Sequence, residues 1–175
     1  PVAGSSLITK IHKAFKEFEG LGIIDKANSK IFAAQATGCS PVTTAIKAGM
    51  EDFKPVKPKT IAKSIAIGNP ADGYYGIKVV GQTNGWGEDV NDQEIVDGIM
   101  LLAETEGIFT ETAGGVCVGV TKKLCEQGRI KKDEVTVISI TGQGLKTTEA
   151  VEDHLNSPVV IEPKLSIFKE IEKDL

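Results

Sequence analysis

The sequence has few of the residues that most often build metal centres and catalytic triads. It contains two histidines, His12 and His154, and aromatic residues make up 5% of its 175 residues. Its three cysteines, Cys39, Cys117 and Cys125, are odd in number and have neither a disulfide nor a zinc-ligand spacing. A zinc cluster and a histidine-based triad are therefore disfavoured. The cysteines are interpreted as small buried hydrophobic residues in a reducing compartment.

The chain also has no excess of basic residues and no long apolar run. Lys and Arg together number 20 against 24 Asp and Glu. This balance provides no positive field for nucleic acid and no polybasic membrane surface. No apolar stretch approaches the roughly 20 residues of a membrane span, and no signal peptide is visible. We expect a chain with one core, without a nucleic-acid or membrane partner, and located in the cytoplasm, with a plastid left open.

The first residues have the pattern of a strand end, a tight turn and a helix. Residues 1–2 are typical of the end of a buried strand, and residues 3–6 are small. Apolar residues then recur at helical spacing: Leu7, Ile8, Ile11, Phe15 and Phe18. A small-residue loop that opens a helix presents unpaired backbone N–H groups to an anion. The alternative is simple capping, in which Ser5 or Ser6 accepts a hydrogen bond from the first helical turn.

The middle of the chain alternates between strand and helix patterns. We expect strands at 30–35 and 85–90, and helices at 74–80 and from residues near 41, 91 and 111. Pro41 suits the first position of its helix, and Asn91 with Glu94 forms a capping box. The predicted fold is α/β, with a mostly parallel sheet flanked by helices.

A β-branched run at 135–140 is followed by Thr141 and a Gly-x-Gly turn at 142–144. The run predicts a strand that is buried on both faces of a parallel sheet. Ligands in open α/β sheets bind outside the carboxyl ends of the strands, so Thr141 is a candidate ligand contact. The alternative is an ordinary turn at a sheet edge. A dinucleotide fold is disfavoured because the third glycine and the acidic partner of its fingerprint are absent.

Four segments in this order resemble the carboxyl-terminal part of the threonine synthases: PVAGSSLITKIHKAFKEFEGLGII, AAQATGCSPV, IAKSIAIGNP, and EGIFTETAGGV with ITGQGLKT. The resemblance covers about residues 1–150 and leaves 151–175 as a carboxyl-terminal tail and helix. It implies the large domain of a fold-type II pyridoxal-phosphate enzyme of the tryptophan-synthase-like group. The sequence departs from the family at Ser5 and Ser6, where many members have Gly and Asn.

The resemblance also implies a set of site residues. The residues that match the family's loop around the cofactor phosphate are Ala3, Gly4, Ser5, Ser6 and Leu7. Thr141 matches the residue that hydrogen-bonds the pyridine nitrogen of pyridoxal 5'-phosphate. The implied reaction converts O-phospho-L-homoserine and water to L-threonine and phosphate, and the implied assembly is a homodimer.

No lysine of this sequence matches the family's motif for the lysine that binds the cofactor covalently, Lys63 and Lys146 included. In the family that lysine and most substrate-phosphate ligands lie in an amino-terminal half, so we expect the chain to be a fragment that is inactive alone. Two alternatives stay open. One is a threonine or serine dehydratase, which has a similar phosphate loop, and the other is a non-catalytic ligand-binding domain of the same fold.

Overall fold

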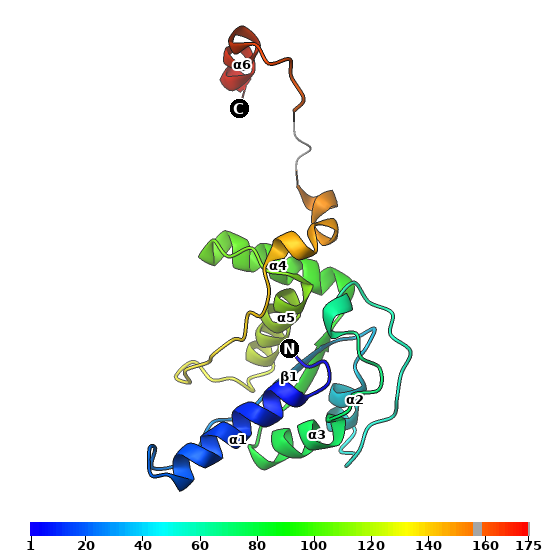
Figure 1. The fold of residues 1–175 in the computed structure, drawn as a ribbon, viewed down its shortest axis with the longest axis vertical. Coiled ribbons are helices and arrows are strands. Elements are labelled where there is room, and N and C mark those ends of the chain that lie inside the picture. The colour runs from blue at the N-terminus through cyan, green and yellow to red at the C-terminus, as the bar shows by residue number, and fades with distance from the viewer. Residues whose placement is uncertain (156–158, 175) are drawn as a thin grey trace.

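The computed structural model describes residues 1–155 and 159–174 and has a small parallel sheet covered by helices on both faces (Figure 1). Strand β1, Ala33–Ala36, pairs in parallel with β2, Gly87–Val90. The register runs from the pair Ala33–Gly87 to the pair Ala36–Val90. The predicted α/β class and the parallel pairing are confirmed. Among the described residues the sheet has two strands.

Six α-helices in the described residues surround the sheet or follow it: α1 Ser6–Gly20, α2 Pro41–Lys47, α3 Gly73–Gln82, α4 Asp92–Glu106, α5 Thr112–Glu126 and α6 Leu165–Ile171. Their starts follow the local sequence. Pro41 occupies the first turn of α2. The Asn91 side chain accepts a hydrogen bond from the Glu94 amide at 3.0 Å, and the Glu94 carboxylate accepts one from the Asn91 amide at 2.7 Å. The predicted capping box is confirmed.

The side chains of β1 alternate between two apolar clusters. Ala34 and Ala36 pack with residues of α4 and α5, whereas Ala33 packs with residues of α2 and α3. This alternation follows from the strand period of two and places one helical layer on each face. Helices α4 and α5 approach closely at two glycines, because a Cβ on Gly98 would lie 2.5 Å from the Gly115 carbonyl oxygen.

A buried amide fixes the start of the chain to this sheet. The Gln35 side chain donates to the Val2 carbonyl at 3.2 Å and accepts from the Val42 and Thr43 amides, both at 3.0 Å. The Val2 amide in turn donates to the Ala34 carbonyl at 2.9 Å. Residues 1–2 therefore lie beside β1, and Val2 is buried as expected, although no strand is assigned to these two residues.

The prediction of a buried strand at 135–140 is wrong. No strand is assigned there, and Val135 and Val137 are 96% and 88% exposed. A strand exists only where a neighbouring backbone supplies hydrogen bonds, and among the described residues no backbone bond joins 135–140 to another segment. The segment has the β-branched composition typical of a strand, but in the described part of the chain no second strand pairs with it.

The tail forms the predicted terminal helix, α6, which lies apart from the sheet and its helices (Figure 1). Val159 and Val160, part of the strand-like stretch before it, are exposed and not in a strand. Within 1–155 and 159–174, no helix has the length and apolar character needed to cross a membrane.

Candidate cofactor site at the start of α1 and the turn after residue 140

The loop before α1 has a left-handed residue at its centre. Ser5 is the N-cap of α1, has φ of 73°, and is 3% exposed. Left-handed backbone costs a residue with a Cβ about 1–2 kcal/mol, so surrounding contacts must hold this conformation. One of them is the hydrogen bond from the Asp72 amide to the Gly4 carbonyl at 3.0 Å, which joins the loop to the start of α3.

Neither serine hydroxyl caps the helix. The Ser6 Oγ donates to the Asp72 carboxylate at 2.5 Å. The Ser5 Oγ is buried, has no hydrogen-bond partner in the described part of the chain, and faces Gly76 of α3, where a Cβ would lie 2.7 Å from it. The capping alternative is therefore not realised, because α1 has no side-chain cap.

The first amides of α1 are consequently left without acceptors. The earliest helical hydrogen bond runs from the Thr9 amide to the Ser5 carbonyl at 3.2 Å. The amides of Ser6, Leu7 and Ile8 have no acceptor among residues 1–155 and 159–174. With the positive end of the helix dipole, three free N–H groups fit a phosphate dianion. Leu7 is 46% exposed, so solvent and ligands reach this turn.

Thr141, the other predicted site residue, is exposed and follows the run at 135–140. The turn after it is docked on the residues before α5. The Gly142 carbonyl accepts from the Glu111 amide at 3.1 Å and from the Thr110 Oγ1 at 2.9 Å, and the Gly144 amide donates to the Phe109 carbonyl at 3.0 Å. Thr141 is thus held from its carboxyl side, by the turn, and not by a strand ladder.

Two polar residues beside these elements were not singled out by the sequence. Asp72 contacts the loop, and its signal was an Asp-Gly pair at a helix start. Glu111 is 5% exposed and its carboxylate lies against the Gly142 Cα, where a Cβ would overlap it. Its signal was a single acidic residue before the small residues that open α5. Neither signal is specific without the fold.

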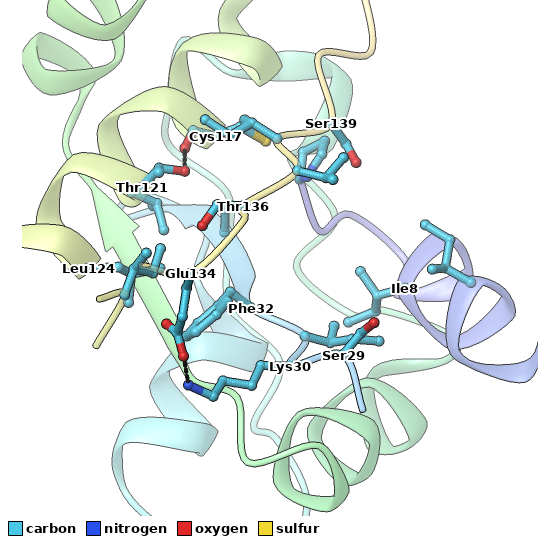
Figure 2. A pocket seen from close by; sticks show the side chains of 18 of the residues that line it. Ile8, Ser29, Lys30, Phe32, Cys117, Thr121, Leu124, Glu134, Thr136 and Ser139 are labelled. Carbon is cyan, nitrogen blue, oxygen red and sulfur yellow. Dashed lines mark hydrogen bonds and ion pairs between the residues drawn. The ribbon is translucent and has the colours of Figure 1, made fainter. Parts of the chain in front are cut away.

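A cavity of about 570 Å³ lies between α1, β1, α5 and residues 134–139 (Figure 2). Its walls are mostly apolar, and an ion pair between Lys30 and Glu134 crosses its rim. Leu7 is the one predicted site residue among those that line it. This cavity is therefore not the predicted phosphate site. The cavity has residues 134–139 on one side and Phe32 and Ala34 on another.

The largest shifts in acidity lie elsewhere. Burial raises the pKa of the Glu88 carboxyl, but hydrogen bonds from Gln127, Lys47 and the Asp89 amide outweigh it and hold that pKa at about 2. Burial alone raises the pKa of the Cys39 thiol. No cluster of metal-ligating side chains occurs in the described part of the chain.

Comparison with known proteins identifies the family of this chain. The sequence profile of a family described as "Pyridoxal-phosphate dependent enzyme" matches residues 1–142. The chain belongs to this family. The phosphate-loop candidate and Thr141 both lie within the matched range, and the cofactor implied by the sequence resemblance is the one that defines the family.

Named relatives are similar to this chain in sequence, and a solved structure is similar to it in fold. A threonine synthase of Methanocaldococcus jannaschii is 40% identical over all of this chain and 43% of its own length. One of Mycobacterium bovis is 31% identical over 97% of this chain and 45% of its own length. A fungal L-serine ammonia-lyase from Rhizomucor miehei has a TM-score of 0.64 at 17% identity, covering 89% of this chain and 49% of its own. The chain thus spans less than half the length of these relatives.

Proposed function

We propose that the protein carrying this sequence is a threonine synthase, which converts O-phospho-L-homoserine and water to L-threonine and phosphate. The proposal rests on relatives of that name at 31–40% identity across nearly the whole chain. The structural observation that supports it is the first turn of α1, with three amides that lack acceptors. Residues 1–150 form the part of the cofactor domain present here, and 151–175 the tail.

Residues 3–7 would hold the cofactor phosphate through the backbone amides of the first α1 turn, and not through both serine hydroxyls. The Ser6 hydroxyl already donates to Asp72, and the Ser5 hydroxyl faces Gly76. Only backbone N–H groups then remain as donors, which explains how the loop tolerates Ser at positions where the resemblance leads us to expect Gly and Asn.

Thr141 would contact the pyridine nitrogen. Bound pyridoxal phosphate supplies an electron sink for the carbanion at the substrate α carbon. The threonine hydroxyl is neutral, so it donates or accepts a hydrogen bond without holding the ring nitrogen protonated as a carboxylate would. Such a partner suits an elimination in which a good leaving group, here phosphate, removes the negative charge. The covalent lysine, the remaining substrate ligands and a homodimeric assembly would come from outside these residues.

A serine or threonine ammonia-lyase is the second candidate, because a solved serine ammonia-lyase and a threonine deaminase share the fold, with TM-scores of 0.64 and 0.53. At 17% and 15% identity these likenesses show the fold alone. The third candidate, a ligand-binding domain without catalysis, is favoured by no specific contact in the structure.

The decisive assay supplies the full-length protein, loaded with pyridoxal phosphate, with O-phospho-L-homoserine, L-serine or L-threonine in separate reactions. Release of phosphate with formation of threonine from the first substrate supports the proposal. Formation of a 2-oxo acid and ammonia from serine or threonine, without turnover of O-phospho-L-homoserine, would assign the ammonia-lyase instead. Binding of the cofactor without either reaction would assign the non-catalytic domain.

Replacing Thr141 by valine tests the ring-nitrogen contact in the same protein. The two side chains are nearly isosteric, so Thr141→Val removes the hydroxyl and little else. Loss of a partner for a buried ring nitrogen costs roughly 1–3 kcal/mol, which corresponds to about a 5- to 150-fold decrease in turnover. We expect the cofactor to stay bound, with an altered absorbance spectrum and reduced turnover. An unchanged spectrum and turnover would remove Thr141 from the site.

A further inference from the structure

Glu111 is a buried carboxylate to which neither the sequence nor the proposed reaction gives a role. It stands at the N-cap of α5, yet its side chain caps no amide. It is 5% exposed, and its one ion-pair partner in the described chain is Lys146, at 3.3 Å. Burying a carboxylate is costly unless it is paired or hydrogen-bonded. The contacts of Glu111 with Gly142 and Lys146 indicate which part of the chain it holds in place.

Those contacts join Glu111 to both ends of the turn after Thr141. The Glu111 carboxylate lies on the Gly142 Cα, its amide donates to the Gly142 carbonyl at 3.1 Å, and its ion pair reaches Lys146 at the end of a 3-10 turn, Gly144–Lys146. One residue thus contacts the turn from the backbone, from the side chain and through a charge. A Cβ on Gly142 would lie 2.2 Å from the Glu111 carboxylate, so the Glu111 side chain would have to move to make room for it.

This arrangement determines where Thr141 stands. Consecutive Cα atoms are about 3.8 Å apart, so fixing Gly142 fixes Thr141 to within that length. On the other side of Thr141, residues 135–140 have no backbone hydrogen bond to another described segment. The contacts of Gly142 therefore restrict where the Thr141 backbone can lie, and Glu111 supplies two of them.

We infer that Glu111 is a positioning residue, which holds Thr141 where its hydroxyl meets the ring nitrogen of the cofactor, acting through Gly142 and the ion pair with Lys146. The inference rests on the proposed function for the identity of the ligand. The contacts of Glu111 with Gly142 and Lys146 do not depend on the proposed function, and they can be measured without cofactor.

The experiment compares Glu111→Gln, Thr141→Val and the double variant in the full-length protein. Glutamine keeps the shape of Glu111 and removes its charge. Glu149→Gln is the matched control, since Glu149 pairs with Lys63 at 3.6 Å on the surface, with 59% of its side chain exposed. The first measurement is hydrogen exchange of the Gly144 amide without cofactor. The second is the absorbance spectrum of the cofactor-loaded protein, with turnover.

We expect the Gly144 amide to exchange about tenfold faster in Glu111→Gln, as for the loss of one charge-assisted contact, and at the wild-type rate in Glu149→Gln. The cofactor spectrum should change in Glu111→Gln in the same direction as in Thr141→Val, and the double variant should match Thr141→Val alone. If Glu111→Gln unfolds the protein, Lys146→Met breaks the same pair from its exposed partner and should show the same pattern.

If the Gly144 amide exchanges at the wild-type rate in both Glu111→Gln and Lys146→Met, the ion pair does not hold the turn and the inference is overturned. Additive spectral changes in the double variant would overturn action through Thr141. The proposed function fails separately: a wild-type protein that binds cofactor but leaves O-phospho-L-homoserine unreacted refutes the threonine synthase assignment, while coupled exchange and spectra in that protein still support the positioning role.

Discussion

Replacing Gly76 by alanine is expected to disturb the loop that opens α1, because α3 carries this glycine where the buried Ser5 side chain lies. The added Cβ would stand 2.7 Å from the Ser5 Oγ and 2.8 Å from its Cβ. Overpacking of this kind costs typically 1–3 kcal/mol, whereas Gly to Ala inside an unobstructed helix gains up to about 1 kcal/mol. The sign of the change in unfolding free energy therefore reports whether the contact exists.

Two further variants isolate that contact. Gly81→Ala, in the same helix with no atom within 4 Å of its new Cβ, should be stabilising by a few tenths to about 1 kcal/mol. Ser5→Gly relieves about 1–2 kcal/mol of left-handed strain and removes an unpaired buried hydroxyl, against about 0.5–1 kcal/mol of added chain entropy. We expect it to be stabilising by about 1 kcal/mol.

The double variant Ser5→Gly with Gly76→Ala is the decisive measurement. Without the Ser5 side chain, the nearest atom to the new Cβ is Ile8 Cδ1, at 3.5 Å, which is ordinary contact. Urea unfolding at 25 °C should show Gly76→Ala as destabilising alone and as neutral or stabilising in the Ser5→Gly background. A Gly76→Ala variant as stable as Gly81→Ala, or one that Ser5→Gly does not rescue, would refute this account of the loop.

Three other predictions concern stability. The pKa of Glu88 is about 2 in the folded protein and 4.5 in the unfolded reference, so the contribution of Glu88 to the unfolding free energy is complete above pH 4.5 and is lost as the pH falls toward 2. Glu88→Gln should therefore reduce the pH dependence of the unfolding free energy in this range by about 1–3 kcal/mol, measured by urea titrations at successive pH values. Asn91→Ala removes the capping box of α4 and should lower the unfolding free energy by about 0.5–2 kcal/mol. Gln93→Ala, two residues further along the same helix, should lower it by less than about 0.5 kcal/mol in the same assay. Gly98→Ala should lower the unfolding free energy by more than 1 kcal/mol because its Cβ would meet the Gly115 carbonyl, and a variant as stable as wild type in thermal unfolding would contradict the close crossing of α4 and α5.

The parts of the fold that the sequence predicted correctly are those that local signals determine. Pro41 marks the start of α2 because its ring fits a first helical turn, and Asn91 with Glu94 marks the start of α4 by satisfying two amides within three residues. The apolar spacing from Leu7 to Phe18 predicted α1 because the helical period can be recognised within the segment itself. These signals need no knowledge of the rest of the chain.

The candidate site was predictable only in part, because its hydrogen bonds connect distant segments. The small residues at 3–6 indicated a loop at a helix start, but no local pattern indicates that Ser6 donates to Asp72, 66 residues away. Nor does any local pattern indicate that Glu111 lies on Gly142. A buried carboxylate and a glycine in separate motifs become one feature only when the fold brings them together.

The failed strand prediction at 135–140 has the same cause. β-Branched residues indicate that a segment suits a pleated, buried surface, but a strand also needs a second backbone at hydrogen-bonding distance. At β1 that backbone is supplied by β2 and by residues 1–2, whose amide at Val2 bonds to Ala34. Beside 135–139 the structure has a cavity instead. The composition of this segment therefore indicates only that it suits a buried pleated surface. Its conformation depends on pairing with a second backbone, which no local pattern encodes. For that reason the position of Thr141 depends on the turn that follows it, where Glu111, Gly142 and Lys146 meet.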